Sequence, residues 1–413
     1  MNFHIMAMHR DRLRSIAVIW AMLAAVAGDA RAQRAVSRAD VVAAALTHGP
    51  RAAFAKADST AVSAGLAIAR QFENPVASIS YSKSVPQQHY TVDVPLDYPW
   101  IRKARIGAAA SGMGAARFRF EFERAAAAFD AETAYTNALA AAKRAAYSRS
   151  TARDADSVLS LARLRRAAGD GSELDVQLAT VSLGQLANAA ARDQLDATAD
   201  ILNVQALMGL PADTVSITLS DPLDAGDANV AAQAGSQLLV AAAEEDLRQA
   251  EQALVLERRM LFAAPSLTIG WEQKDPTGAE PGTLPTVGVA VPLPLFNQNR
   301  GSILLAQSQH DRAAAALALA RIEGAQQAAR ARRELTVALE RLTRSQQLVT
   351  SADTVEKLSL LAYREGASSL PNVIEAQRIA RETLAQYVDD VAAVRNAAAI
   401  VRLLTLTAHR NDQ

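Results

Sequence analysis

Few residues of this chain have the types and spacing that catalysis or metal binding requires. Cysteine is absent, which removes disulfides, thiolate metal ligands and cysteine nucleophiles. The later histidines, His48, His89, His310 and His409, are dispersed and form no metal-ligand spacing with one another. An H-E-x-x-H motif, a phosphate-binding Walker A loop and a G-x-S-x-G turn are also missing. We therefore expect no enzyme, no catalytic residues, no metal site and no cofactor.

The composition indicates helices rather than a charged binding surface. Lysine plus arginine and aspartate plus glutamate number 43 each, so the 413-residue chain is formally neutral. A protein that binds nucleic acid would show a basic stripe, which this sequence lacks. Half of the residues are apolar but only 5% are aromatic, and alanine blocks such as 125–128 and 313–316 recur. Alanine has the highest helix propensity and a small side chain, which predicts long, closely spaced helices.

Residues 1–32 have the features of a secretory signal peptide. An arginine-rich start precedes the apolar stretch 16–28, and Ala30-Arg31-Ala32 supplies an A-x-A cleavage pattern. A simple N-terminal anchor is the alternative interpretation. No later stretch approaches the ~18 uninterrupted apolar residues of a transmembrane helix. The sequence therefore predicts export to the periplasm or outer membrane of a Gram-negative bacterium.

Two separated motifs recur at one offset, which indicates an internal duplication. The Gly-x-x-Ser-x-x-x-Val-x-x-Ala motif at 169–179 returns 197 positions later, at 366–376. A Val-Pro-Leu motif shows the same offset between 94–96 and 291–293. We therefore divide the chain after the signal peptide into a first repeat, 33–225, and a second repeat, 226–413.

Each repeat is predicted to contain two strands, a very long helix, a glycine turn and a returning helix. Alternation such as Ile79 between Ser78 and Ser80 is typical of a strand. The proline-free stretch after each hairpin is long enough for a helix of ~100 Å, which must pack along its whole length. Apolar residues spaced by four and three over 373–401 predict a coiled-coil seam. In the first repeat we expect strands at about 75–83 and 89–98, a long helix at about 101–168 and a return helix at about 172–209; in the second, strands at about 265–273 and 285–295, a long helix at about 299–365 and a return helix at about 370–407.

Aromatic residues gather near the ends of the four strands. The predicted belt consists of Tyr81, Tyr90, Tyr98, Trp100, Trp271 and Phe296, with Phe72 and Phe262 close by. A transmembrane barrel carries aromatic girdles at such positions. A soluble sheet with one buried face explains the alternation equally well. Four strands cannot close a barrel, and open edges in lipid leave backbone groups unpaired, so a barrel would need several chains.

Three strings carry a resemblance to a known family: 291–301 (VPLPLFNQNRG), 168–176 (AGDGSELDV) and 363–370 (YREGASSL). With the order of elements, they make the chain similar to the TolC-like outer-membrane efflux proteins, and the first string resembles the heavy-metal (CzcC-like) branch. The resemblance implies a mainly α fold with a small β part. It further implies a homotrimer whose twelve strands form one outer-membrane β-barrel, continued by a periplasmic α-helical coiled-coil tunnel.

The same resemblance implies site residues. A periplasmic gate would involve Asp175 and Tyr363, hydrogen-bonded between the two helical hairpins. Relatives often carry two acidic residues on the second return helix, and here Asn372 and Glu375 occupy these positions. A double carboxylate ring is therefore in doubt, and at most a Glu375 ring is expected, which would favour cations.

The partners implied are a periplasmic adaptor (membrane fusion) protein, an inner-membrane pump of the RND type and outer-membrane lipid, with no nucleic acid. The adaptor would dock at the hairpin tips, Gly169, Ser172, Gly366 and Ser369. The chain would be the exit duct of a tripartite efflux system, with metal cations as candidate cargo. Drugs or a type I secreted polypeptide are alternative cargoes, and a non-transporting coiled-coil scaffold is the alternative class. Acidic pairs such as Asp389-Asp390 are expected to face solvent.

Overall fold

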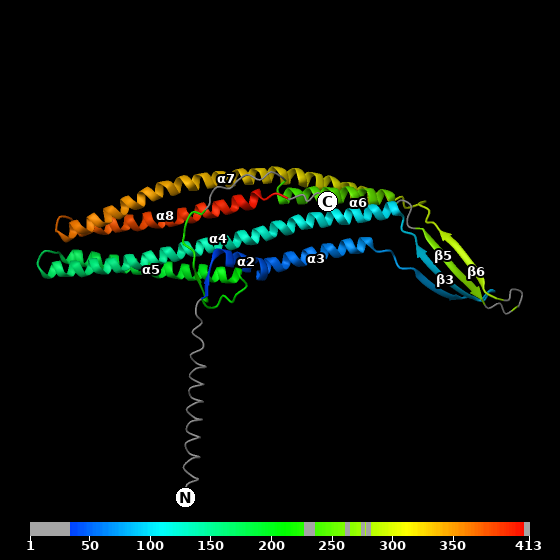
Figure 1. Ribbon diagram of the computed structural model, residues 1–413, viewed down its shortest axis with the longest axis horizontal. Helices are drawn as coiled ribbons and strands as arrows, with labels where there is room; N and C mark the ends of the chain where they lie inside the picture. Colours follow the sequence, from blue (N-terminus) through cyan, green and yellow to red (C-terminus); the bar gives the residue numbers. More distant parts are fainter. Residues whose placement is uncertain (1–33, 227–235, 261–264, 274–276, 278–281, 409–413) are drawn as a thin grey trace, which may run out of the picture. The chain divides into compact units, whose positions relative to one another are not determined.

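The computed structural model describes residues 34–226, 236–260, 265–273, 277 and 282–408 (Figure 1). The predicted signal peptide 1–32 and Phe262 lie outside these residues. The helices are α2 (Arg38–His48), α3 (Pro50–Arg70), α4 (Pro99–Ala167), α5 (Glu173–Leu207), α6 (Leu238–Arg259), α7 (Arg300–Arg364) and α8 (Leu370–Thr405). The strands are β1 (Arg34–Val36), β2 (Val76–Tyr81), β3 (Gln88–Pro95), β4 (Ile217–Leu219), β5 (Ser266–Gln273) and β6 (Leu284–Ala290). None of the helices in this part of the chain is long and apolar enough to cross a membrane.

The chain divides into two compact units, and each takes segments from both predicted repeats. The turn unit comprises residues up to 45, 131–224 and 345–392. The sheet unit comprises residues 46–130, 225–344 and 393–413. The turn unit holds both glycine turns, whereas the sheet unit holds the strands of both hairpins.

The sheet unit contains an antiparallel sheet with the strand order β2-β3-β5-β6. The two hairpins therefore meet at β3 and β5, where Tyr90 pairs with Trp271 and Val92 with Ile269. Gly270 allows this close pairing, because a Cβ atom there would lie 2.4 Å from the Tyr90 carbonyl oxygen. The strand pairing predicted within each hairpin is thus extended by a pairing between hairpins.

Register places the apolar side chains of the sheet on one face and most polar side chains on the other. One apolar row runs Ala77, Val92, Ile269 and Val287, and the next runs Ile79, Tyr90, Trp271 and Pro285. The opposite face carries rows such as Ser78, Thr91, Gly270 and Thr286. The apolar face is uncovered in the single chain, with Ile79 78% and Val287 74% exposed.

Three strands end before the residues that the sequence predicts. The strand expected at 75–83 ends at Tyr81. The strand expected at 285–295 ends at Ala290, and the strand expected at 89–98 ends at Pro95. Proline has no backbone N–H to donate to a strand ladder. Pro292 and Pro294 therefore end the pairing of β6, although the alternation of apolar residues continues beyond them.

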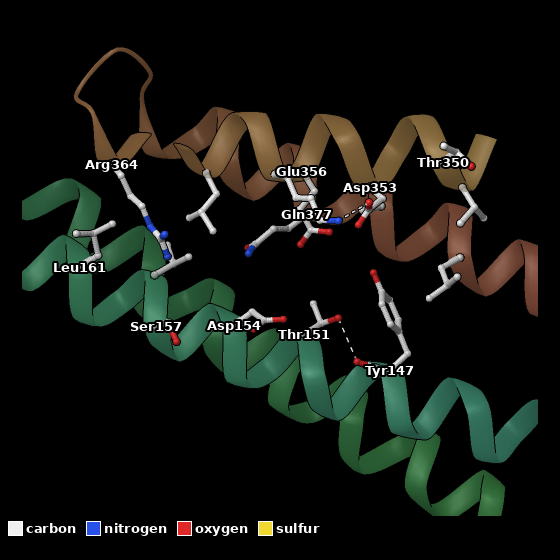
Figure 2. A pocket seen from close by; sticks show the side chains of 16 residues that line it. Tyr147, Thr151, Asp154, Ser157, Leu161, Thr350, Asp353, Glu356, Arg364 and Gln377 are labelled. Atoms are coloured by element: carbon white, nitrogen blue, oxygen red, sulfur yellow. Dashed lines mark hydrogen bonds and ion pairs between the residues drawn. The ribbon is translucent and has the colours of Figure 1, made fainter. Parts of the chain in front are cut away.

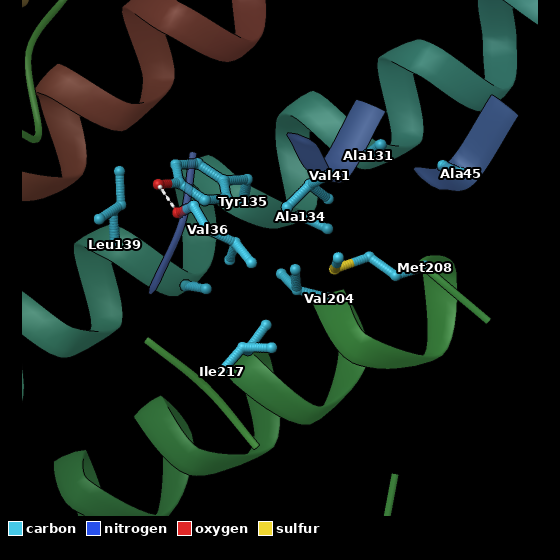
Figure 3. Packing of buried hydrophobic residues seen from close by; sticks show 11 residues of the cluster. Val36, Val41, Ala45, Ala131, Ala134, Tyr135, Leu139, Val204, Met208 and Ile217 are labelled. Atoms are coloured by element: carbon cyan, nitrogen blue, oxygen red, sulfur yellow. Dashed lines mark hydrogen bonds between the residues drawn. The ribbon is translucent and has the colours of Figure 1, made fainter. Parts of the chain in front are cut away.

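The turn unit has a small buried core where α2, α4 and α5 meet the parallel strands β1 and β4 (Figure 3). Tyr135 is fully buried there, and its hydroxyl donates a hydrogen bond of 3.0 Å to the Val36 carbonyl. Gln205 is also fully buried, and its amide donates to the carbonyls of Pro211 and Thr214 while it accepts the Ser216 N–H. These bonds satisfy the polar groups of both side chains.

The duplication is visible in a pair of hydrogen bonds within the turn unit. Ser148 donates to the Asp193 carboxylate, and 197 positions later Ser345 donates to the Asp390 carboxylate. Each bond joins a long helix to its return helix. Asp390 is only 2% exposed, so the expectation that it faces solvent is wrong. The serine and a second donor, the Gln386 amide at 2.9 Å, compensate its burial.

Candidate functional site

The two helix-reversing turns of the turn unit have the same backbone design. Gly169 and Gly366 have positive φ angles of 89° and 76°. In each turn the glycine N–H bonds back three residues and the next N–H bonds back five, to Arg165 and Ala362 respectively. This is the Schellman arrangement, in which glycine adopts the left-handed conformation without a Cβ penalty. The Gly-x-x-Ser repeat thus encodes two equivalent helix ends.

The residues after the glycines differ between the turns. Ser172 caps α5 by accepting the Asp175 N–H at 3.1 Å, and the Asp175 carboxylate accepts the Ser172 N–H at 3.2 Å. This capping box satisfies two backbone donors at the helix start. At the corresponding point of α8 the Asn372 side chain instead donates to the Ser368 hydroxyl at 3.1 Å. Ser369, like Ser172, lies exposed at its turn.

Tyr363 lies in an apolar cluster beneath the turns and is only 3% exposed. Burial is the main reason why its pKa is raised, and the Asp175 carboxylate raises that pKa further. Among the described residues, however, no hydrogen bond joins Asp175 to Tyr363, because the carboxylate bonds to its own helix start. The expected Asp175–Tyr363 hydrogen bond is therefore not formed within this chain.

Arg165 makes the inter-hairpin connection that the sequence analysis assigned to Asp175. Its Nη1 donates to the Tyr363 carbonyl at 2.7 Å, across a separation of 198 residues. Its guanidinium lies over the Tyr363 ring, 4.9 Å from the centroid, and its Nη2 donates to the Asp170 carbonyl at 3.4 Å. Arg165 thus contacts both helix ends. Sequence reasoning missed it because the guanidinium recognises a backbone carbonyl, which leaves no pattern in residue types.

Glu375 is exposed on α8 and is neutralised by its neighbour. Arg378 donates two hydrogen bonds to the Glu375 carboxylate, at 2.9 and 2.6 Å, and two more to Glu382. The Arg378 bonds lower the pKa of Glu375. Within one chain, Glu375 therefore belongs to a Glu375–Arg378–Glu382 ladder, which carries one net negative charge per chain. The Glu375 ring expected in a trimer stays a prediction.

The aromatic residues of the predicted belt all lie in the sheet unit. Tyr90 and Trp271 stack at 5.3 Å between ring centroids, across the β3–β5 pairing. Tyr98 and Trp100 stack at 4.5 Å just after β3. Tyr81, at the end of β2, and Phe296, after β6, are 64% and 100% exposed. The rings therefore form one group near the β2–β3 loop and another near the long helices.

No protein-family model matches this sequence, and no curated protein matches it. Solved structures do match. A membrane protein from Pseudomonas aeruginosa superposes with a TM-score of 0.78 and 20% identity, covering 92% of this chain and 93% of that chain.

Two further matches are named as outer-membrane channels. The CmeC outer membrane channel of Campylobacter jejuni has a TM-score of 0.75 and 14% identity, covering 89% of this chain and 85% of that chain. The open state of the MtrE outer membrane channel of Neisseria gonorrhoeae has a TM-score of 0.71 and 16% identity, covering 90% of both chains. Nearly the whole chain therefore has the fold of these channels.

Proposed function

We propose that this chain is the outer-membrane exit duct of a tripartite efflux system. One observation carries the proposal: an open four-stranded sheet with an exposed apolar face is joined to α4 and α7, helices of 69 and 65 residues, in the fold of outer-membrane channels. Lipid is the natural cover for such a face, and the long helices suit a passage through the periplasm.

The open edges of the sheet support a shared barrel. β2 and β6 each have only one neighbour in the described sheet. An unpaired backbone group in hydrocarbon costs several kcal/mol, on the order of a lost hydrogen bond in an apolar medium. Three copies would close twelve strands into one barrel without an edge, and their long and return helices would form one periplasmic tunnel.

The turns suit contact with other proteins of the system. Gly169, Ser172, Gly366 and Ser369 are exposed, and the adjacent Leu174 is 66% exposed although it is apolar. We assign these tips to a periplasmic adaptor, which would connect the duct to an inner-membrane pump of the RND type.

The gate is assigned to the cluster beneath these tips. Arg165 and Tyr363 would hold the two hairpins together, and the Glu375–Arg378–Glu382 ladder would set the charge at the entrance. Asp175 and Asn372 would stabilise the starts of the two return helices, α5 and α8, at this gate. The similarity of segment 291–301 to the heavy-metal branch favours metal cations as cargo.

Mass measurement and single-channel recording test this function. The mature protein, purified in a non-ionic detergent, should have the mass of a trimer and should form discrete conducting pores in planar bilayers. A water-soluble monomer, or a trimer that inserts into bilayers without conducting, would overturn the proposal.

A further inference from the structure

The turn unit contains a cavity of about 730 Å³ between α4, α7 and α8 (Figure 2). Cavities of about 300–1,000 Å³ are the size that binds small organic molecules. Its walls include the apolar side chains of Val158, Leu161, Leu360 and Leu384. None of the residues of the Glu375–Arg378–Glu382 ladder lines this cavity, although the ladder lies on the same stretch of α8.

Acidic groups enter this cavity from two helices. Asp154 comes from α4, and Asp353 and Glu356 come from α7. Lys357 forms an ion pair with Asp353 at 2.6 Å, which offsets one of the three charges. Asp154 and Glu356 remain, with Arg364 as the other cationic residue in the lining. Burial raises the pKa of Glu356, and repulsion from Asp154 and Asp353 raises it further. A positive ligand charge would relieve this repulsion.

A buried amide also enters the cavity. Gln377 on α8 is only 5% exposed, and Figure 2 shows its side chain reaching into the space between the helices. No residue in the described part of the chain hydrogen-bonds to this amide. The rest of the side chain is covered by protein, so the amide is held with its polar end open to the cavity. A polar group of a ligand could hydrogen-bond to it there in place of water.

The lining suits an organic cation better than a metal ion. No group of three or more histidine or carboxylate residues in the described chain is placed to hold a metal. The volume exceeds that of a single ion, and apolar walls flank the acidic residues. Tyr147 adds an aromatic ring, which attracts ammonium groups through its π face.

We propose that this cavity binds a small organic cation, an amine or quaternary ammonium with an apolar body. The ammonium would lie between Asp154 and Glu356, the Gln377 amide would hydrogen-bond the ligand, and the leucine side chains would cover its apolar part. This inference rests on the proposed function and adds organic cations, as a second class of cargo, to the metal cations that segment 291–301 favours.

Equilibrium binding of ethidium, an aromatic organic cation, tests the proposal. Fluorescence titration of the mature trimer in non-ionic detergent should show saturable binding. Glu356→Gln should weaken binding at least tenfold, because it removes a partly buried charge while keeping the volume, and Gln377→Leu should weaken it severalfold. Glu340→Gln, an exposed carboxylate elsewhere on α7, is the matched control and should bind as the unmodified chain does.

The proposal would be overturned by the absence of saturable binding, by equal affinity of the Glu356→Gln variant, or by displacement of ethidium by equimolar Zn²⁺. Equal binding of the anionic dye fluorescein would also overturn it. Conductance measured on the same preparations separates the proposed cation site from the proposed duct function. Conducting trimers that bind no ethidium refute only the cation site, whereas ethidium binding by protein that never conducts refutes only the duct.

Discussion

Arg165 connects the ends of the two hairpins through Tyr363. Its hydrogen bond to the Tyr363 carbonyl and its position over the Tyr363 ring both end if the guanidinium is removed. A partly exposed charge-assisted bond of this kind contributes on the order of 1 kcal/mol, or about fivefold in an open-to-closed ratio. Such a contact is weak enough for an adaptor to disrupt.

Arg165→Ala should therefore raise the mean conductance of single channels, or the fraction of time they spend open, about fivefold in planar bilayers. Arg166→Ala is the matched control, because Arg166 pairs with Glu173 inside one hairpin. Tyr363→Phe should have little effect, since the described contacts of Tyr363 use its ring and its carbonyl. Equal conductance of the Arg165→Ala and Arg166→Ala channels would remove Arg165 from the gate.

A second prediction at the scale of residues concerns Arg378 and the ion selectivity of the channel. It neutralises one of two carboxylates, so Arg378→Gln should double the net negative charge of the ladder and raise the cation-to-anion permeability ratio severalfold at low salt. At about 1 M salt the Debye length is only ~3 Å, and the gain should largely vanish. Reversal-potential measurements give the ratio. A similar gain in the Arg381→Gln variant would mean that selectivity depends on the overall charge of α8 rather than on the Glu375–Arg378–Glu382 ladder.

The pH dependence of that gain follows from the direction of the pKa shift. Arg378 holds the pKa of Glu375 below its ordinary value, so in the unmodified chain this carboxylate stays charged to low pH. Without Arg378 the pKa of Glu375 should rise to the ordinary value of a glutamate side chain, and the added selectivity should be lost as the pH falls through that value. A gain that persisted at lower pH would come from other groups.

At the scale of elements, local patterns predict the helices and strands but not the partners across the chain. The expected long helix at 299–365 forms at Arg300–Arg364, because proline is absent and glycine ends it. The strand predicted at 285–295 ends at Ala290, because Pro292 and Pro294 lack the backbone N–H that the ladder needs, although the alternation of apolar residues continues. The Ser172–Asp175 capping box is a local feature, because its two residues lie three positions apart at one helix start. The Arg165–Tyr363 and Ser345–Asp390 contacts depend on packing between helices, which spacing along one helix does not encode.

The β3–β5 pairing gives an element-scale prediction. A Cβ at Gly270 would meet the Tyr90 carbonyl oxygen at 2.4 Å, so Gly270→Ala should break the junction between the hairpins. Gly288→Ala is the control, since its Cβ would lie an ordinary 3.8 Å from the Thr268 side chain. We expect Gly270→Ala to reduce the yield of membrane-inserted trimer strongly, measured by gel analysis of outer membranes. Normal yield would show that the strands can separate there.

At the scale of the whole molecule, the exposed apolar sheet and its two open edges require a partner surface. β2 and β6 are the edge strands, so closure by identical chains would place β2 of one copy beside β6 of the next. A closed ring stops at a fixed number of chains, whereas an open arrangement continues into filaments. The absence of cysteine makes this testable, because introduced thiols have no native competitors.

The double variant Ser78→Cys/Thr286→Cys places one thiol on each edge strand, on the same face of the sheet. A flexible thiol crosslinker applied to isolated outer membranes should give covalent dimers and trimers, because each copy would offer one edge to each neighbour. The series should stop at three chains. Ser78→Cys alone has no thiol on the facing strand and should yield no trimer. Ser78→Cys/Thr91→Cys, whose positions pair within one hairpin, should crosslink inside the monomer. Crosslinked products of more than three chains, or crosslinks confined to single chains, would contradict a closed trimeric barrel.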